Sequence, residues 1–186
     1  MKRLIPPGQG RGLLVLGDNL SLCSALPEGV ADLIVADPPF HTGRARVGSA
    51  PSTAGQQEAE SKDARPASFG DRWESPDAYL AFLRPRLQAL HRMLAPQGSL
   101  VVHLDQRAVH EVKIELDGIF GRRRFINEII WHYTGGGRSR RYFSRKHDTL
   151  LWYARGDGWT FNIDAVRVPY HPNSGSRRMD PGRSPH

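Results

Sequence analysis

Three short apolar runs along the chain predict buried strands, at Leu13 to Leu16, Leu33 to Ala36 and Ser99 to Leu104. Each run is almost continuously apolar rather than alternating, which is typical of strands in a parallel sheet covered on both faces. Two further strand-like runs, Asn127 to Tyr133 and Asp148 to Ala154, flank a stretch rich in glycine and arginine. The pattern therefore predicts a sheet with several buried strands.

Helical periodicity appears between and after these runs. The clearest helix is predicted from Ser75 to Leu94, where leucines recur three and four residues apart and Ser75 is a favourable cap. Pro85 lies inside this helix and is expected to kink it. Shorter helices are predicted at Asn19 to Leu26 and Gln106 to Phe120. Because strands alternate with helices, we expect an α/β fold built on a partial doubly wound, mostly parallel sheet with a basic loop region.

Two parts of the chain carry no periodic pattern. Residues 44–68 are rich in Ala, Gly, Ser and Pro and are expected to form a flexible insertion loop. Residues 158–186 are expected to form an irregular tail, since the stretch from Pro169 onwards is unsuited to any core element. The predicted domain therefore spans residues 1–157.

Composition narrows the class of protein. The chain has 186 residues, of which 39% are hydrophobic and 24% charged, so it is neither a disordered polyelectrolyte nor a membrane protein. No apolar run approaches the roughly 20 residues of a membrane helix, and the N-terminus lacks the apolar core of a signal peptide. The single cysteine, Cys23, excludes a disulfide framework and a multi-cysteine zinc site. We expect a cytoplasmic protein without a metal site.

Charge is concentrated in one segment, from Gly121 to His147. This segment holds eight basic residues and one acid, Glu128, so its charge of +7 equals that of the whole chain. Clustered basic residues are expected of a protein that binds the phosphate backbone of nucleic acids. The alternative interpretation is a solvated basic surface without a partner.

The residues Asp37-Pro38-Pro39-Phe40 directly follow the predicted strand that ends at Ala36. In open α/β sheets, ligands bind beyond the carboxyl ends of strands. Asp37 is an anionic acceptor, and Pro38 contributes a carbonyl without a competing N–H of its own. Two acceptors suit an exocyclic amino group, which has two donors, and Phe40 offers a flat face for stacking a heterocycle. The tetrapeptide is a candidate pocket for an amino-bearing base; the alternative is a proline-rigidified turn with a capping Asp.

With its surroundings, this tetrapeptide resembles the DNA methyltransferases that modify exocyclic amino groups, the adenine-N6 and cytosine-N4 family. The resemblance is carried by LGDNLSLCSALPEGVADLIVADPPFHTGR at 16–44, FGDRWESPDAYLAFLRPRLQALHRMLAPQGSLVVHLDQ at 69–106 and FINEIIWHYTGGGRSRRYFSRKHDTLLWYARGD at 125–157. The chain is most similar to the permuted group of this family, in which the catalytic half precedes the cofactor half.

The resemblance implies a Rossmann-like methyltransferase fold and a mechanism. A target base, most simply adenine, is flipped out of double-stranded DNA because its amino group is inaccessible inside the stack. Asp37 and the Pro38 carbonyl accept the two amino hydrogens, so that the nitrogen attacks the methyl group of S-adenosylmethionine. Phe40 stacks on the base, and Pro39 completes the catalytic turn. Catalysis is then positioning and electrostatics, without a covalent enzyme intermediate.

Further candidate residues lie near the same edge of the sheet. Asp18 follows the first apolar run, and the resemblance implies that it approaches the adenine ring of the cofactor; the alternative is a helix cap. His103 and Asp105 end the third run and are expected to be pocket-wall residues, since no third metal ligand is spaced nearby. The residues expected to contact DNA are Arg138, Arg140, Arg141, Arg145 and Lys146.

The glycine-rich cofactor loop of the family, an aromatic-Gly-x-Gly pattern after a strand, is absent from this sequence. The chain is therefore expected to be the catalytic and DNA-facing half of an enzyme, with residues 121–147 facing DNA. A missing C-terminal half or a second subunit is the expected protein partner.

Alternative functions remain open from the sequence. Within the family, Asp at the position of Asp37 goes mostly with adenine and Ser mostly with cytosine, so adenine N6 is favoured over cytosine N4. An inactive DNA-binding fragment keeps the base pocket and the basic segment but lacks activity. Related enzymes that act on RNA or on a protein glutamine more often carry Asn at this position, which argues against that substrate class.

Overall fold

The structure is a computed structural model that describes residues 12, 14–41, 44–47, 68–71, 73–135 and 140–168. Sequence predictions that fall elsewhere lie outside the described residues. They include Arg138, most of the loop at 44–68 and the tail beyond residue 168.

The central sheet has the strand order β1 (Ala31–Ala36), β4 (Leu94–Leu104), β6 (His147–Ala154) and β5 (Phe125–His132). The α/β class is confirmed, but the prediction of a mostly parallel sheet is wrong. Only β1 and β4 are parallel, whereas β4 with β6 and β6 with β5 are antiparallel. The reason is connectivity. A helical crossover joins β1 to β4, while β5 and β6 are joined by one loop and therefore pair as a hairpin.

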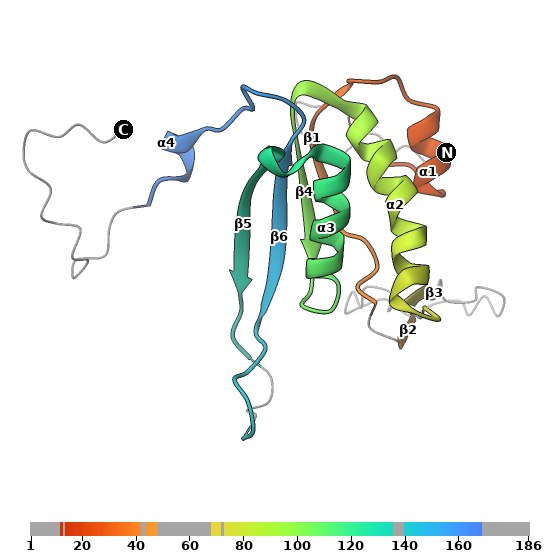
Figure 1. Cartoon of the computed structure of the whole chain (residues 1–186), viewed down its shortest axis with the longest axis vertical. Coiled ribbons are helices and arrows are strands. Elements are labelled where there is room, and N and C mark those ends of the chain that lie inside the picture. The colour runs from red at the N-terminus through yellow and green to blue at the C-terminus, as the bar shows by residue number, and fades with distance from the viewer. Residues whose placement is uncertain are drawn as a thin grey trace, which may run out of the picture.

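Three helices cover one face of this sheet (Figure 1), namely α1 (Asn19–Ser24), α2 (Pro76–Met93) and α3 (Val109–Phe120). α1 packs on α2, and α2 packs on α3, so the three form one layer. Ser75 caps α2 as predicted, because its hydroxyl accepts from the backbone N–H of Ala78 at 3.1 Å. The second helical layer that a doubly wound sheet requires is not found among the described residues.

The core lies between this helical layer and the sheet. The predicted leucine stripe of α2 is confirmed, with Leu83 and Leu87 buried and Leu80 and Leu90 packed against them. The sheet and α3 supply most of the remaining buried side chains, which are Leu100, Val102, Leu104, Val112, Leu116, Leu151 and Tyr153. Each such side chain contributes about 1.5–3 kcal/mol relative to an exposed position, so this interface holds the domain together.

The opposite face of the sheet is apolar but uncovered within the described residues. Leu33 and Val35 of β1 are 62% and 66% exposed, and Ile129 and Trp131 of β5 are 42% and 62% exposed. The face therefore explains why the strands read as continuous apolar runs although only one side meets a helix.

Two predicted elements need correction. The run at 13–16 forms no strand in its described positions, and Leu16 is fully exposed at 100%. A strand needs a hydrogen-bonding neighbour, and none of the described strands lies beside this segment. Within the predicted loop at 44–68, β2 (Arg44–Val47) pairs antiparallel with β3 (Ser68–Asp71). That ladder depends on backbone pairing, which the polar composition of the loop did not reveal.

Element ends also shift. β4 begins at Leu94, directly after α2, rather than at Ser99. The predicted irregular tail contains a single helical turn, α4 (Ile163–Val166), and before it Phe161 packs its ring 5.4 Å from that of Trp152. No helix in the described ranges is long and apolar enough to cross a membrane.

Candidate active site

The turn Asp37-Pro38-Pro39-Phe40 lies at the carboxyl end of β1, as the sequence predicts. It is anchored from α2, because the buried Tyr79 hydroxyl donates to the Pro39 carbonyl at 2.9 Å. The next residue, His41, has a φ of 55° and stacks on the Tyr79 ring at 5.4 Å. A non-glycine residue in this left-handed region is under strain, which marks the turn as a constrained local structure.

Strand register brings His103 beside the first residue of this turn. Ala36 of β1 pairs with Val102 of β4, so Asp37 and His103 are the next residues along two parallel neighbours. His103 Nδ1 lies 3.1 Å from Asp37 Oδ1, and the His103 ring meets that of Phe40 edge-on at 5.0 Å. The Asp37 carboxylate is still 70% exposed, so it remains accessible to a ligand.

A polar pocket of about 260 Å³ opens beside Phe40. Its walls include Asp105, Tyr133, Arg145 and Asp148, which come from the ends of β4, β5 and β6. Partial burial, and then the Asp148 carboxylate that accepts from its hydroxyl, raise the pKa of Tyr133. The expectation that Asp105 is a pocket-wall residue fits this placement.

A second, mainly apolar cavity of about 300 Å³ lies on the other side of the turn. It is lined by Asn19, by Asp37, Pro38 and Pro39, and by apolar side chains of β1 and α2. The Asp37 turn thus separates an apolar cavity from a polar one. Such an arrangement suits a reaction between two bound groups, one on each side.

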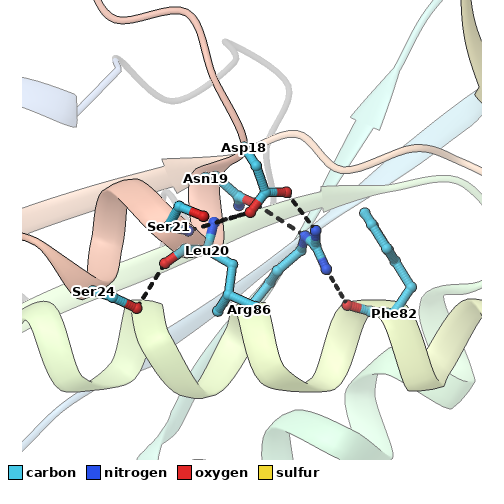
Figure 2. Close-up of polar contacts among 7 residues, drawn as sticks. All are labelled: Asp18, Asn19, Leu20, Ser21, Ser24, Phe82 and Arg86. Atoms are coloured by element: carbon cyan, nitrogen blue, oxygen red, sulfur yellow. Dashed lines mark hydrogen bonds and ion pairs between the residues drawn. The ribbon is translucent and has the colours of Figure 1, made fainter.

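Asp18 lies at the start of α1 and acts there as a helix cap (Figure 2). Its Oδ1 accepts from the backbone N–H groups of Leu20 and Ser21, and its Oδ2 lies 2.6 Å from the Arg86 guanidinium. The side-chain hydrogen bond from Arg86 lowers the pKa of Asp18 below its usual value. Arg86 also donates to Asn19 Oδ1 at 3.0 Å and packs over the Phe82 ring, so it fixes α1 to α2.

The basic residues lie on an arm that joins β5 to β6. Because β6 begins where β4 ends, with Leu104 paired to Thr149, this arm starts at the same sheet edge as Asp37. Figure 1 shows it extending beyond the sheet. It carries Arg140, Arg141, Arg145 and Lys146, and beside them Phe143 is 99% exposed.

Not all of the predicted basic segment lies on this arm. Residues Arg122–Arg124 form the short 3-10 helix η1 before β5, and Arg124 pairs with Asp157 at 2.6 Å. The eight residues of β5 separate them from the arm by about 26 Å, at 3.3 Å per residue. The segment at 121–147 is therefore divided between two ends of the sheet.

Several residues of this region were not singled out by sequence patterns. Tyr79 and Arg86 read only as members of an amphipathic helix, and Tyr133 read as a packing aromatic or a DNA contact. Their roles depend on contacts across long sequence separations, for which the sequence carries no local signal. No group of three or more His, Cys, Asp or Glu side chains that suits a metal ion occurs in the described part of the chain.

A protein-family model described as DNA methylase, covering N6 and N4 methyltransferases, matches residues 31–185. This chain belongs to that family of DNA methylases. Its fold and the placement of the Asp37 turn agree with the resemblance seen in the sequence.

Characterised relatives are type II methyltransferases. The chain is 27% identical over 161 residues to M.KpnI of Klebsiella pneumoniae, covering 84% of this chain and 36% of the relative. It is 31% identical over 147 residues to M.EcaI of Enterobacter cloacae, covering 78% of this chain and 29% of the relative. The chain thus spans about a third of the length of these relatives.

Solved structures show the same fold. The cytosine-N4-specific PvuII DNA methyltransferase matches with a TM-score of 0.55 and 17% identity, covering 81% of this chain and 51% of that one. The DNA modification methylase TTHA0409 of Thermus thermophilus matches with a TM-score of 0.51 and 17% identity, covering 83% and 60%. TTHA0409 has also been crystallised with S-adenosyl-L-methionine.

Proposed function

We propose that this chain is the catalytic, DNA-facing portion of a methyltransferase that transfers a methyl group from S-adenosylmethionine to the N6 amino group of a flipped-out adenine. The observation that carries the proposal is the Asp37 turn at the carboxyl end of β1. There an exposed carboxylate and the Phe40 ring lie between an apolar cavity and a polar one. Family membership supports the reaction class.

The target base is proposed to occupy the polar pocket and to stack on Phe40. Asp37 accepts one hydrogen of the exocyclic amino group, and the Pro38 carbonyl accepts the other. These two contacts draw the nitrogen lone pair out of conjugation with the ring and aim it away from the base plane. Because both acceptors are held before the base arrives, the stabilisation costs little reorganisation during the reaction.

The apolar cavity fits the adenosine part of the cofactor. Its apolar walls from β1 and α2 suit a purine ring, and Asn19 supplies a polar side chain at its edge. S-adenosylmethionine supplies an electrophilic methyl group when bound. Asp18 is proposed to assist indirectly, because its cap and its contact with Arg86 hold Asn19 at the cavity.

Double-stranded DNA is proposed to lie along the basic arm. Arg140, Arg141, Arg145 and Lys146 supply phosphate contacts at the sheet edge that holds Asp37. Arg138 belongs to the same loop and is proposed to contribute in the same way. The exposed Phe143 lies among these cations, where an aromatic ring meets bases as well as backbone.

A further protein segment is proposed to complete the enzyme. The face of the sheet with Leu33, Val35, Ile129 and Trp131 is apolar and exposed, and the chain matches only part of its relatives. A segment that covers this face, in the same polypeptide or in a second subunit, would also supply the glycine-rich cofactor loop. Sheet strands of this apolar type are normally buried on both faces.

The test is methyl incorporation into plasmid DNA, measured for the chain alone and supplemented with a cofactor-loop segment by fusion or in trans. Asp37→Ala is expected to lower the rate by about 10²–10³, the typical loss for one preorganised electrostatic group, while DNA affinity stays nearly unchanged. Asp32→Ala is the matched control, since Asp32 is an exposed acid on the same strand. Mass spectrometry of the digested DNA identifies the methylated base.

Two results would contradict the proposal. Near-wild-type transfer by Asp37→Ala would return the turn to a purely structural role. Absence of transfer in every supplemented form, with salt-dependent DNA binding retained, would favour an inactive DNA-binding fragment. N4-methylcytosine as the product would keep the mechanism and replace the base.

A further inference from the structure

Three polar side chains form a row across the end of the central sheet. His103 of β4 lies between Asp37, which follows β1, and Asp148 of β6. His103 Nδ1 is 3.1 Å from Asp37 Oδ1, and its Nε2 is 3.5 Å from Asp148 Oδ2. The register explains the row, because His103 pairs with Leu150 and Asp148 is therefore its diagonal neighbour on the same face.

The chemistry of these groups fixes the direction of the shorter contact. An ionised carboxylate has acceptors alone, so the hydrogen between His103 and Asp37 belongs to the imidazole Nδ1. The Asp37 carboxylate is 70% exposed and, apart from such a contact, has freedom to rotate. One of its oxygens is thus engaged by His103, and the other is left for a ligand.

His103 also touches the second functional side chain of the turn. Its ring meets the Phe40 ring edge-on, with centroids 5.0 Å apart and planes at 89°. On its far side, Asp148 is engaged by the Tyr133 hydroxyl, so the row continues into the wall of the polar pocket. His103 is therefore the residue through which the acceptor, the stacking ring and the pocket wall are held in register.

We propose that His103 is a positioning residue for methyl transfer. It donates Nδ1–H to one oxygen of Asp37 and so presents the other oxygen to the amino group of the target base. This inference rests on the proposed function, because it assigns His103 a task in that reaction. Misplacement of a reacting or catalytic group by about 1 Å can cost about 10²-fold in rate, which sets the expected scale.

Two substitutions separate the two nitrogen atoms of the ring. In His103→Asn the side-chain amide nitrogen occupies the place of Nδ1 and keeps a donor for Asp37. In His103→Gln the amide nitrogen reaches instead toward the place of Nε2 and Asp148. We expect His103→Ala and His103→Gln to lower kcat about 10²-fold with little change in KM for DNA, whereas His103→Asn keeps most of kcat.

A structural role of His103 predicts a different pattern. Then His103→Asn and His103→Gln would lose activity equally, KM and kcat would change together, and the unfolding temperature would fall in step. That pattern would overturn the inference. The methyl-transfer measurements use the same supplemented chain as the Asp37→Ala experiment, so the variants are compared in one context.

The contact itself is tested without activity by nitrogen NMR of the 186-residue chain labelled at histidine. Asp37→Asn is expected to shift the Nδ1 resonance of His103, and Asp148→Asn is expected to shift mainly Nε2. If Asp37→Asn leaves the His103 resonances in place, the contact is absent and the inference fails. If the resonance shifts but wild-type protein transfers no methyl group, the proposed function fails, and the positioning role fails with it.

Discussion

The hydrogen bond from the Tyr79 hydroxyl to the Pro39 carbonyl offers a sharp test of how the catalytic turn is held. Tyr79 belongs to α2, is 1% exposed, and donates to Pro39 at 2.9 Å. Tyr79→Phe removes the hydroxyl but keeps the ring, its packing against Trp73 and its stacking on His41. The substitution therefore isolates the one polar contact between α2 and the turn that the described residues show.

The magnitude follows from the burial of both partners. A neutral intramolecular hydrogen bond contributes about 0.5–1.5 kcal/mol net, and a carbonyl left unpaired in the interior costs about 1–3 kcal/mol. Pro39 is only half-buried, so water can partly replace the missing donor. We expect Tyr79→Phe to lower the free energy of unfolding by about 1 kcal/mol, equivalent to about 2–4 °C for a chain of this size.

The effect on the turn is expected to exceed the effect on global stability. Without the hydroxyl, the strained conformation at His41 is supported by ring stacking alone, so the turn gains freedom and methyl transfer slows. Denaturant unfolding followed by circular dichroism measures the first effect, and hydrogen exchange at the Phe40 amide measures the second. Tyr79→Ala is the comparison variant, with an expected loss of about 3–5 kcal/mol because the ring is removed.

Two outcomes would refute this reasoning. Unchanged stability and unchanged exchange at Phe40 in Tyr79→Phe would mean that the hydroxyl does not hold the turn. A loss as large as that of Tyr79→Ala would mean that the hydroxyl, rather than the buried ring, supplies the stability.

Two further predictions concern DNA and pH. Replacing Arg140 and Arg141 together with Ala should flatten the salt dependence of DNA affinity by about 0.9 in log–log slope for each phosphate that is no longer neutralised, whereas Arg84→Ala, far along α2, should not; filter binding between low and high salt measures both. Burial first, and then the Arg155 cation, lower the pKa of His91. The unfolded chain therefore binds the proton more readily below about pH 6.5, so thermal stability should fall as the pH drops through that value, and His91→Phe should reduce the fall.

Much of the site was predictable because its signal is local. The α/β class follows from apolar runs that alternate with helical periodicity, and the Asp37 turn follows from four consecutive residues after a strand. The cap at Ser75 and the leucine stripe of α2 are local patterns as well, and both are present. Periodicity reports burial on a neighbouring surface, so it predicts which residues are inside.

Strand direction and pairing were decided only by the tertiary structure. A continuous apolar run predicts burial but not the neighbour, so β6 read as part of a parallel sheet although it pairs antiparallel with β4 and β5. The same limit applies to the run at 13–16, which is apolar enough for a strand but lies beside none of the described strands. Backbone hydrogen bonds come from partners distant in sequence, and no local pattern encodes them.

The contacts that shape the site were likewise beyond the sequence. Asp37 and His103 are 66 positions apart along the chain, yet the strand register places both of them in one row with Asp148. Arg86 reaches Asp18 across 68 positions and turns a candidate cofactor residue into a helix cap fixed to α2. The sequence determined which chemical groups are present at the sheet edge. Tertiary packing decided which of them touch, because a distance in space depends on the fold of every residue between them.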